Sequence, residues 1–368
     1  MNLLKPRLGL ALSGGGIRAA IFHLGVLQYL AEIGLFGRFV NISSVSGASL
    51  LMGAVFAANN NKWPSSYEFI NKVQPHVRRI ILDNDIQEIA LRRLPFSPKY
   101  WGNRVGIIAS VLEEKWGITG TLQDLPIYPY WEINATTFET GKNFRLRRDY
   151  MGDPLIGYVQ NPKLPISHMI AASAAFPVLI GPYVLKTEGL TWTKDKKGLV
   201  PIEEAVKKCT LWDGGVYDNL GLEALYKTTK NFKRKLDDEI NFLIVSNAGA
   251  PLGRQVRKGH LSVENLKRLL DISSDHAEIE RSRDVYSNVM AVGDGYYIKM
   301  GMTIQQIADM LKAPQEKVTS LKKECLTQDE THKVLHYPTT LKSPSVDDFE
   351  LIFRHGYECI KCVFLLSL

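Results

Sequence analysis

The chain has 368 residues, of which 45% are hydrophobic and 23% are charged. This is ordinary globular composition, and it excludes a disordered, a collagen-like and a coiled-coil protein. The formal net charge is +7, so the surface favours anionic partners, either nucleic acid or acidic lipid headgroups. The longest apolar stretch, residues 45–58, is interrupted by serine and glycine and is shorter than the roughly 20 residues of a membrane-spanning helix.

Strand-like and helix-like segments alternate through the first 60 residues. Residues 7–13 are apolar and run into three glycines, which predicts a short buried strand. Apolar residues at helical spacing then occupy residues 17–33, residues 39–45 form a second apolar run, and a further helical run ends at Ala58. This alternation predicts an α/β fold, with a central mostly parallel sheet and helices on both faces.

Residues 59–126 break this alternation, because their pattern is mostly polar and helical. We therefore predict an inserted helical cap over about residues 59–126. Strand signals return at Tyr130, and the sequence becomes helical again beyond Gly249. The predicted organisation is a core of residues 1–249 that carries the cap, followed by a helical C-terminal extension, residues 250–368, packed on the core.

Three consecutive glycines, Gly14, Gly15 and Gly16, separate the first strand from the first helix. Without side chains they allow a tight turn whose backbone N–H groups point one way, beside the positive end of a helix. Such a loop holds an anion, either a phosphate or the oxyanion of a tetrahedral intermediate. A dinucleotide site also needs an acidic residue after the next strand, and no Asp or Glu occurs between Gly34 and Tyr67. The phosphate interpretation therefore lacks its second requirement.

The second apolar run is followed by Gly47, Ala48 and Ser49, immediately before an apolar helical run. This is the context of a nucleophile elbow, a sharp turn that lifts a serine above the edge of the sheet. The usual elbow pattern would place glycine at position 51, where this chain has Leu51. Ser49 alone would be interpreted as a helix N-cap, but a glycine loop on the preceding strand favours a nucleophilic role.

A candidate base lies downstream, where Asp213 ends a short strand and is followed by Gly214 and Gly215. An Asp-Gly pair is a strong turn signal, so a simple hairpin is one interpretation. The other is a carboxylate at the same sheet edge as Ser49, where the glycines permit a close approach. In that case Asp213 takes the proton of Ser49 when the serine attacks.

These motifs, in this order, resemble those of the patatin-like phospholipases, which are serine–aspartate lipid acyl hydrolases. The small-residue run 171–177 and the run 134–141 resemble the same family. The resemblance implies a three-layer α/β sandwich and phospholipase A-type hydrolysis through an acyl-enzyme. We expect no cofactor and no metal ion, because the sequence contains no HExxH motif, no paired CxxC and no EF-hand spacing. The residues to which the resemblance assigns roles are Ser49 as nucleophile, Asp213 as base, Gly14, Gly15 and Gly16 as oxyanion hole, and Arg18 as a residue that orients the loop or contacts a phosphate headgroup.

The partners implied by the resemblance are a phospholipid or another acyl-ester lipid, and no nucleic acid. Together with the basic surface, it predicts transient contact with an anionic membrane. Only four cysteines occur, and Cys359 and Cys362 fit one face of a helix better than a disulfide or metal framework. A reducing compartment is therefore expected. We place the protein in the cytoplasm, with peripheral contact at the inner membrane face.

The residues leave other interpretations open. The same serine and aspartate would serve an esterase or thioesterase that acts on soluble substrates. A non-catalytic regulator would instead bind nucleotide at the glycine loop, or DNA through residues 303–321, whose apolar spacing resembles a helix-turn-helix. A lipase gated by a ligand or partner is a further alternative. A histidine base is also open, and the candidates that follow Asp213 are His260, His276, His332, His336 and His355.

Overall fold

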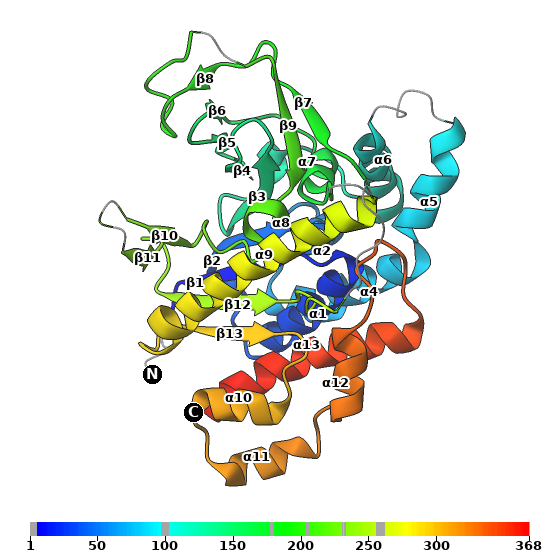
Figure 1. The fold of residues 1–368 in the computed structure, drawn as a ribbon, viewed down its shortest axis with the longest axis vertical. Helices are drawn as coiled ribbons and strands as arrows, with labels where there is room; N and C mark the ends of the chain where they lie inside the picture. The colour runs from blue at the N-terminus through cyan, green and yellow to red at the C-terminus, as the bar shows by residue number, and fades with distance from the viewer. Residues whose placement is uncertain are drawn as a thin grey trace.

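The computed structural model describes residues 6–96, 103–176, 180–203, 206–229, 231, 233–254 and 262–367. Within these residues, eleven strands form one mixed sheet in the order β13-β12-β1-β2-β3-β4-β5-β6-β8, with β9 beside β3 and β7 beside β9 (Figure 1). The strands of this sheet are β1 (Leu8–Leu12), β2 (Phe39–Val45), β3 (Tyr130–Thr137), β4 (Asn143–Leu146), β5 (Tyr150–Asp153), β6 (Gly157–Gln160), β7 (Tyr183–Lys186), β8 (Trp192–Thr193), β9 (Lys208–Asp213), β12 (Phe242–Asn247) and β13 (Gly295–Lys299). A separate hairpin pairs β10 (Tyr226–Thr228) with β11 (Arg234–Leu236).

Helices precede, interrupt and follow these strands in the sequence. The α-helices are α1 (Gly16–Glu32), α2 (Gly47–Ala58), α3 (Ser66–Glu68), α4 (Gln74–Asp83), α5 (Ile86–Arg93), α6 (Arg104–Trp116), α7 (Ile166–Ser173), α8 (Gly215–Asp218), α9 (Val263–Val285), α10 (Ile304–Leu311), α11 (Gln315–Lys322), α12 (Gln328–Leu335) and α13 (Val346–Ser367). Short 3-10 or π turns are η1 (Phe36–Arg38), η2 (Phe69–Val73), η3 (Leu94–Phe96), η5 (Leu122–Asp124) and η6 (Tyr286–Met290).

The strands β13, β12, β1, β2 and β3 pair parallel to one another. β1 and β12 consist of short, mainly apolar runs, and every residue in both is buried. Strands buried on both faces show such continuous apolar runs rather than an alternation. The prediction of a mostly parallel central sheet is confirmed for this part, whereas the strands from β4 to β9 pair antiparallel.

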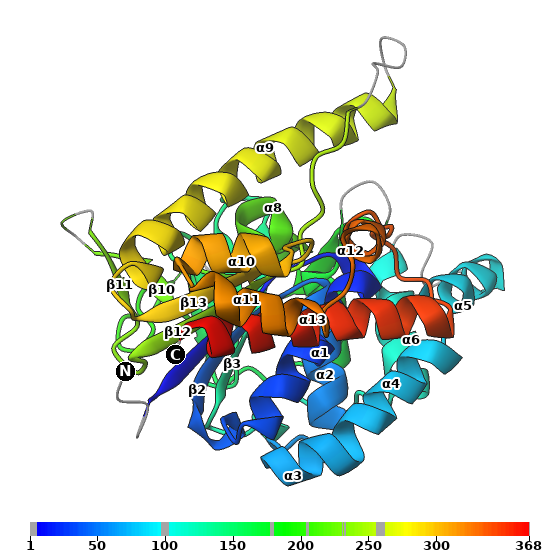
Figure 2. The same cartoon turned by 90° about the horizontal axis from the view of Figure 1, so that it is seen from below.

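Helices cover both faces of the parallel strands, as predicted. Figure 2 shows α9 on one side of the sheet and α1, α2 and α13 on the other. The backbones of α1 and α13 are in direct contact where the helices cross. A Cβ added at Gly356 would lie only 1.9 Å from the carbonyl O of Phe22. A Cβ added at Gly25 would likewise lie 2.0 Å from the carbonyl O of Phe353. Glycine on each helix therefore permits the backbones to touch, and the C-terminal helix is packed directly on the core.

Residues 59–126 contain the helices α3, α4, α5 and α6, joined by turns and short 3-10 or π segments. These helices contact α1, α2 and α7, and they also meet the C-terminal part of the chain. Arg78 forms an ion pair with Glu350 at 2.6 Å, and the amide of Gln87 donates to the carbonyl O of Leu341 at 3.3 Å. The insertion is thus joined to both the core and the C-terminal segment.

The C-terminal region contains one strand that the sequence analysis did not anticipate. β13 pairs with β12 at the edge of the central sheet, so the sheet includes a strand from beyond residue 249. The domain boundary that we predict at residue 249 remains a prediction. The run 303–321 forms α10 and α11, and Ile304, Ile307 and Ala308 of α10 are buried. No helix in the described part of the chain is long and apolar enough to span a membrane.

Candidate active site

The carboxyl ends of β2 and β9 meet on one edge of β3. Asn134 of β3 pairs with Val45, the last residue of β2, and the next residue, Ala135, pairs with Asp213, the last residue of β9. Because β2 runs parallel to β3 and β9 runs antiparallel to it, the two strands point at each other. This arrangement brings the residue that follows Val45 next to Asp213.

That residue, Ser46, forms a sharp turn between β2 and α2. Its backbone has φ 52° and ψ −117°, which is unusual for a residue with a side chain and matches the strained turn of a nucleophile elbow. The glycine loop lies beside it, since a Cβ added at Gly14 would be 3.1 Å from the Cβ of Ser46. Gly47 permits this packing, because a Cβ there would lie 2.0 Å from the carbonyl O of Gly16. Ser46 is partly exposed, so its side chain is accessible at the elbow.

Asp213 is buried, with 3% of its surface exposed. Burial raises the pKa of its carboxyl to about 6, while hydrogen bonds from the amide of Gly215 and from the side chain of Ser46 act to lower that pKa. The Gly215 amide donates to Oδ1 at 2.7 Å. A carboxylate that contacts a serine hydroxyl and has a pKa near 6 is suited to act as a general base near neutral pH.

Ser49 does not occupy the elbow, and the prediction that it lies there is wrong. It is the third residue of α2, has no exposed surface, and its hydroxyl bonds to the hydroxyls of Ser44 and Ser173 at 2.9 Å each. The elbow serine is the residue at the turn itself, which is Ser46. In the sequence Ser46 directly follows the apolar run and precedes Gly47, but the sequence does not show at which residue the strand ends.

One of the three amides of the glycine loop already has a hydrogen-bond acceptor. The amide of Gly14 donates to the carbonyl O of Asn219 at 3.0 Å, so the expectation that Gly14 contributes to the oxyanion hole is contradicted. In the described part of the chain, the amides of Gly15 and Gly16 have no hydrogen-bond acceptor. The loop therefore leaves Gly15 and Gly16 as candidate donors.

Arg18 is a buried clamp for the glycine loop. Its side chain is 1% exposed, and its guanidinium donates to the carbonyl O of Tyr337 at 2.7 Å and to that of Ala248 at 3.1 Å. Of the two predicted roles, these contacts support orientation of the loop. A side chain so deeply buried does not contact a lipid headgroup at the surface.

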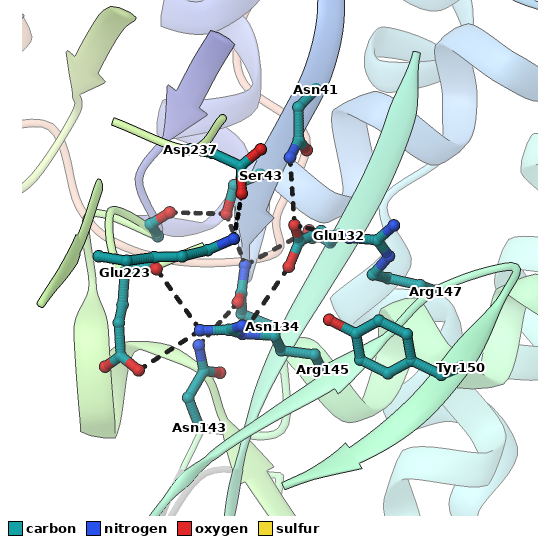
Figure 3. A network of polar contacts seen from close by, with 12 residues as sticks. Asn41, Ser43, Glu132, Asn134, Asn143, Arg145, Arg147, Tyr150, Glu223 and Asp237 are labelled. Atoms are coloured by element: carbon teal, nitrogen blue, oxygen red, sulfur yellow. Dashed lines mark hydrogen bonds and ion pairs between the residues drawn. The ribbon is translucent and has the colours of Figure 1, made fainter. Parts of the chain in front are cut away.

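A buried ionic network supports β3 next to the site. Glu132 is 1% exposed and forms ion pairs with Arg147 at 3.0 Å and with Arg145 at 3.7 Å, as Figure 3 shows. Burial acts to raise the pKa of Glu132, but Arg147 and Arg145 hold it below its usual range. The side-chain amide of Asn134 donates to the hydroxyl of Ser43 at 2.8 Å and so ties β3 to β2. The network therefore fixes the strand on which β2 and β9 meet.

The histidines with buried side chains have structural partners. The ring nitrogens of His23 contact Ser246 Oγ at 2.8 Å and Ser13 O at 3.0 Å. His355 lies on α13 and accepts a hydrogen bond from the amide of Gly301 at 2.8 Å. His260 lies outside the described residues. Asp213, which lies beside Ser46, is therefore better supported as the base than these two buried histidines.

A family model for patatin-like phospholipases matches residues 10–226, which is more than half of the chain. The chain belongs to the patatin-like phospholipase family. This membership supports lipid hydrolase activity, and it confirms the resemblance drawn from the motifs. No curated protein matches the chain in a sequence comparison.

A solved structure of low sequence identity shows the same fold. Human GIVD cytosolic phospholipase A2, in complex with methyl gamma-linolenyl fluorophosphonate inhibitor and terbium chloride, has a TM-score of 0.50 at 13% identity, covering 100% of this chain and 60% of that chain. A further structure of the human enzyme has a TM-score of 0.44 at 13% identity, covering 67% of this chain and 46% of that chain. VipD from Legionella pneumophila has a TM-score of 0.42 at 14% identity, covering 98% of this chain and 67% of that chain. The chain therefore spans about half the length of the human enzyme.

Residues beyond the family match also contact the glycine loop. The carbonyl O of Thr340 accepts a hydrogen bond from the amide of Ile17 at 2.9 Å. A Cβ added at Gly16 would lie 2.4 Å from that same oxygen, so the C-terminal segment packs directly on the loop. Together with the Arg18 contacts, this makes the C-terminal part of the chain a structural support of the candidate oxyanion hole.

Proposed function

We propose that this protein hydrolyses acyl esters of phospholipids, with Ser46 as nucleophile and Asp213 as its general base. The observation that carries the proposal is that β2 and β9 end at adjacent positions on β3, which places Ser46, on a strained strand-to-helix turn, beside the buried carboxylate of Asp213. Membership of the patatin-like phospholipase family supports a lipid ester as the substrate. In this proposal the nucleophile is Ser46 and not Ser49, which the sequence had indicated.

The reaction needs only groups of this chain and water. Ser46 Oγ attacks the ester carbonyl carbon while the Asp213 carboxylate takes the hydroxyl proton, and the oxyanion accepts hydrogen bonds from the Gly15 and Gly16 amides. The intermediate then expels the alcohol, which recovers the proton from Asp213 and leaves as a lysophospholipid. Water attacks the acyl-enzyme with Asp213 as base again, which releases the fatty acid and restores Ser46.

The test is intact-mass analysis after prolonged treatment with a fluorophosphonate probe, followed by fragmentation of the labelled peptide. We expect one adduct on the wild type, located at Ser46. Ser46→Ala and Asp213→Asn should abolish it, whereas Ser49→Ala, the matched control three residues away, should still be labelled at Ser46. An adduct on Ser49, or no adduct on folded wild type, would reject the assignment.

The substrate class is tested with two substrates and one enzyme preparation. Phospholipid vesicles should release fatty acid and lysophospholipid, and the release should require Ser46. Hydrolysis of a short-chain nitrophenyl ester without any action on vesicles would instead favour the esterase or thioesterase interpretation. Loss of activity in Ser46→Ala should be about 10³-fold or more, as for other nucleophile deletions.

We also propose that the substrate is met at a membrane surface, transiently and from the cytoplasmic side. The support is the net charge of +7, which attracts anionic headgroups. Binding to sedimented vesicles should rise with the fraction of anionic lipid and fall with salt. Binding that is indifferent to anionic lipid would remove the electrostatic basis of this proposal.

A further inference from the structure

Three buried serine hydroxyls lie in a row beneath the elbow. They come from β2, α2 and α7, and none of Ser44, Ser49 and Ser173 has exposed surface. The Oγ atoms of Ser44 and Ser49 are 2.9 Å apart, as are those of Ser49 and Ser173. The row ends at the elbow, because the backbone amide of Ser46 donates to Ser173 Oγ at 3.0 Å.

The contacts at the two ends determine the direction of every hydrogen bond in this row. Ser173 Oγ lies 2.7 Å from the carbonyl O of Asn134, which only accepts, so the Ser173 proton points there. Ser173 must then accept the proton of Ser49. At the other end, Trp131 Nε1, which only donates, lies 2.8 Å from Ser44 Oγ. Since Ser49 donates to Ser173, Ser44 must donate to Ser49.

The result is a chain with one direction, from Trp131 through Ser44, Ser49 and Ser173 to the carbonyl O of Asn134. Ser173 Oγ uses its single proton on Asn134 and its two acceptor positions on Ser49 and Ser46. Its lone pair is thereby aimed at the Ser46 amide and not free to rotate away. Buried hydrogen bonds in such a chain are strengthened by one another, and an unpaired member is costly.

The Ser46 amide is the group that this chain holds. A residue with a side chain at positive φ is strained, and it keeps that conformation only where its surroundings hold it there. The Ser173 hydroxyl supplies such a restraint on the amide side of Ser46, and the start of α2 supplies another, since the carbonyl O of Ser46 accepts from the amides of Ser49 and Leu50 at 2.9 and 3.1 Å.

We infer that Ser173 is a positioning residue that holds the Ser46 backbone in its reactive conformation. Ser49 and Ser44 act through Ser173, by fixing the orientation of its hydroxyl. This inference rests on the proposed function, in which Ser46 is the nucleophile. It also assigns a role to Ser49, and to the serine within the small-residue run 171–177, of which residues 171–176 are described.

The experiment measures the first-order rate of Ser46 labelling by saturating fluorophosphonate. Ser173→Ala should slow labelling about 100-fold, because a small displacement of a nucleophile has an effect of this size. Ser49→Ala should slow it about 10-fold, since Ser173 keeps its bond to the Ser46 amide but loses a donor. Ser44→Ala should slow it only about 2- to 3-fold, because it lies one bond further from Ser46.

The matched control is Ser167→Ala, which removes another buried hydroxyl from the same helix, α7. Ser167 is 1% exposed and donates to Glu113 at 2.6 Å, away from this chain of hydroxyls. It should lower the melting temperature about as much as Ser49→Ala while leaving the labelling rate unchanged. The pH midpoint of labelling should stay at the wild-type value in all these variants, because Asp213 is untouched, and Ser173→Thr, which retains the hydroxyl, should recover much of the rate.

The graded order of rates decides the inference. Equal losses in the Ser173, Ser49 and Ser44 variants, or a matching loss in Ser167→Ala, would reduce the chain to a general packing effect and overturn the inference. If Ser173→Ala does not fold, the difference between Ser49→Ala and Ser44→Ala decides alone. Wild type that carries no label on Ser46 would refute the proposed function, whereas labelled wild type without graded losses would refute only this inference.

Discussion

The substitution Asp213→Asn should remove activity and yet stabilise the protein at alkaline pH. The pKa of this buried carboxyl is raised from 3.8 to about 6, chiefly because burial disfavours its charged form. A rise of about 2 pKa units corresponds to about 3 kcal/mol between the protonated and ionised carboxyl. Whenever Asp213 is ionised, this cost lowers the free energy of unfolding of the wild type.

The sign follows from the order of the two pKa values. The pKa of Asp213 is higher in the folded than in the unfolded state. The carboxyl therefore contributes its full amount to the free energy of unfolding below pH 4, and this contribution is lost as the pH rises through about 6. The wild type should therefore lose up to about 3 kcal/mol of unfolding free energy from this group between pH 4 and pH 8. Asp213→Asn does not ionise, so it should keep that free energy, less about 1 kcal/mol for its weaker contact with Ser46.

The assay is urea unfolding followed by tryptophan fluorescence, for both proteins at several values of pH. The quantity to compare is the difference in unfolding free energy between variant and wild type, which cancels the titration of all other groups. This difference should increase by about 2–3 kcal/mol from pH 4 to pH 8. A difference that is independent of pH, or a variant less stable at pH 8, would refute the claim that Asp213 is a buried carboxylate with a raised pKa. In the wild type, labelling of Ser46 should fall about tenfold for each pH unit below 6.

Three further predictions test the surroundings of the site. Gly47→Ala should abolish labelling of the elbow and lower the melting temperature, because its Cβ would lie 2.0 Å from the carbonyl O of Gly16; normal activity in this variant would contradict the elbow geometry. Arg18→Met should lower the free energy of unfolding by about 3 kcal/mol in urea, because the carbonyl groups of Tyr337 and Ala248 lose the guanidinium that donates to them. If Arg18 contacted a headgroup instead, the variant would fold normally and raise KM. The Sγ atoms of Cys325 and Cys362 are 3.5 Å apart, so diamide should link these two thiols in a peptide map; a link within the CxxC motif would contradict the placement.

The parallel core could be predicted because each part of the evidence was local. The apolar run that forms β1, the glycine loop and the helical spacing of α1 follow one another in the sequence, and each needs only near neighbours to be interpreted. The strand β13 was not predicted because its run of five residues, Gly295–Lys299, is short, and its pairing with β12 identifies it as a strand.

The sequence by itself determined the family and the α/β class, and it predicted a serine–aspartate chemistry for the site, because a glycine loop, a serine-bearing strand end and an Asp-Gly-Gly turn occur in a specific order. It did not determine which serine lies at the turn after β2. That depends on where β2 ends, and β2 ends at Val45, beside the position that β9 occupies on the edge of β3. The pairing of β9 with β3 joins segments more than 70 residues apart, so no local pattern contains it. Only this tertiary contact places Ser46 against Asp213 and buries Ser49 beneath it.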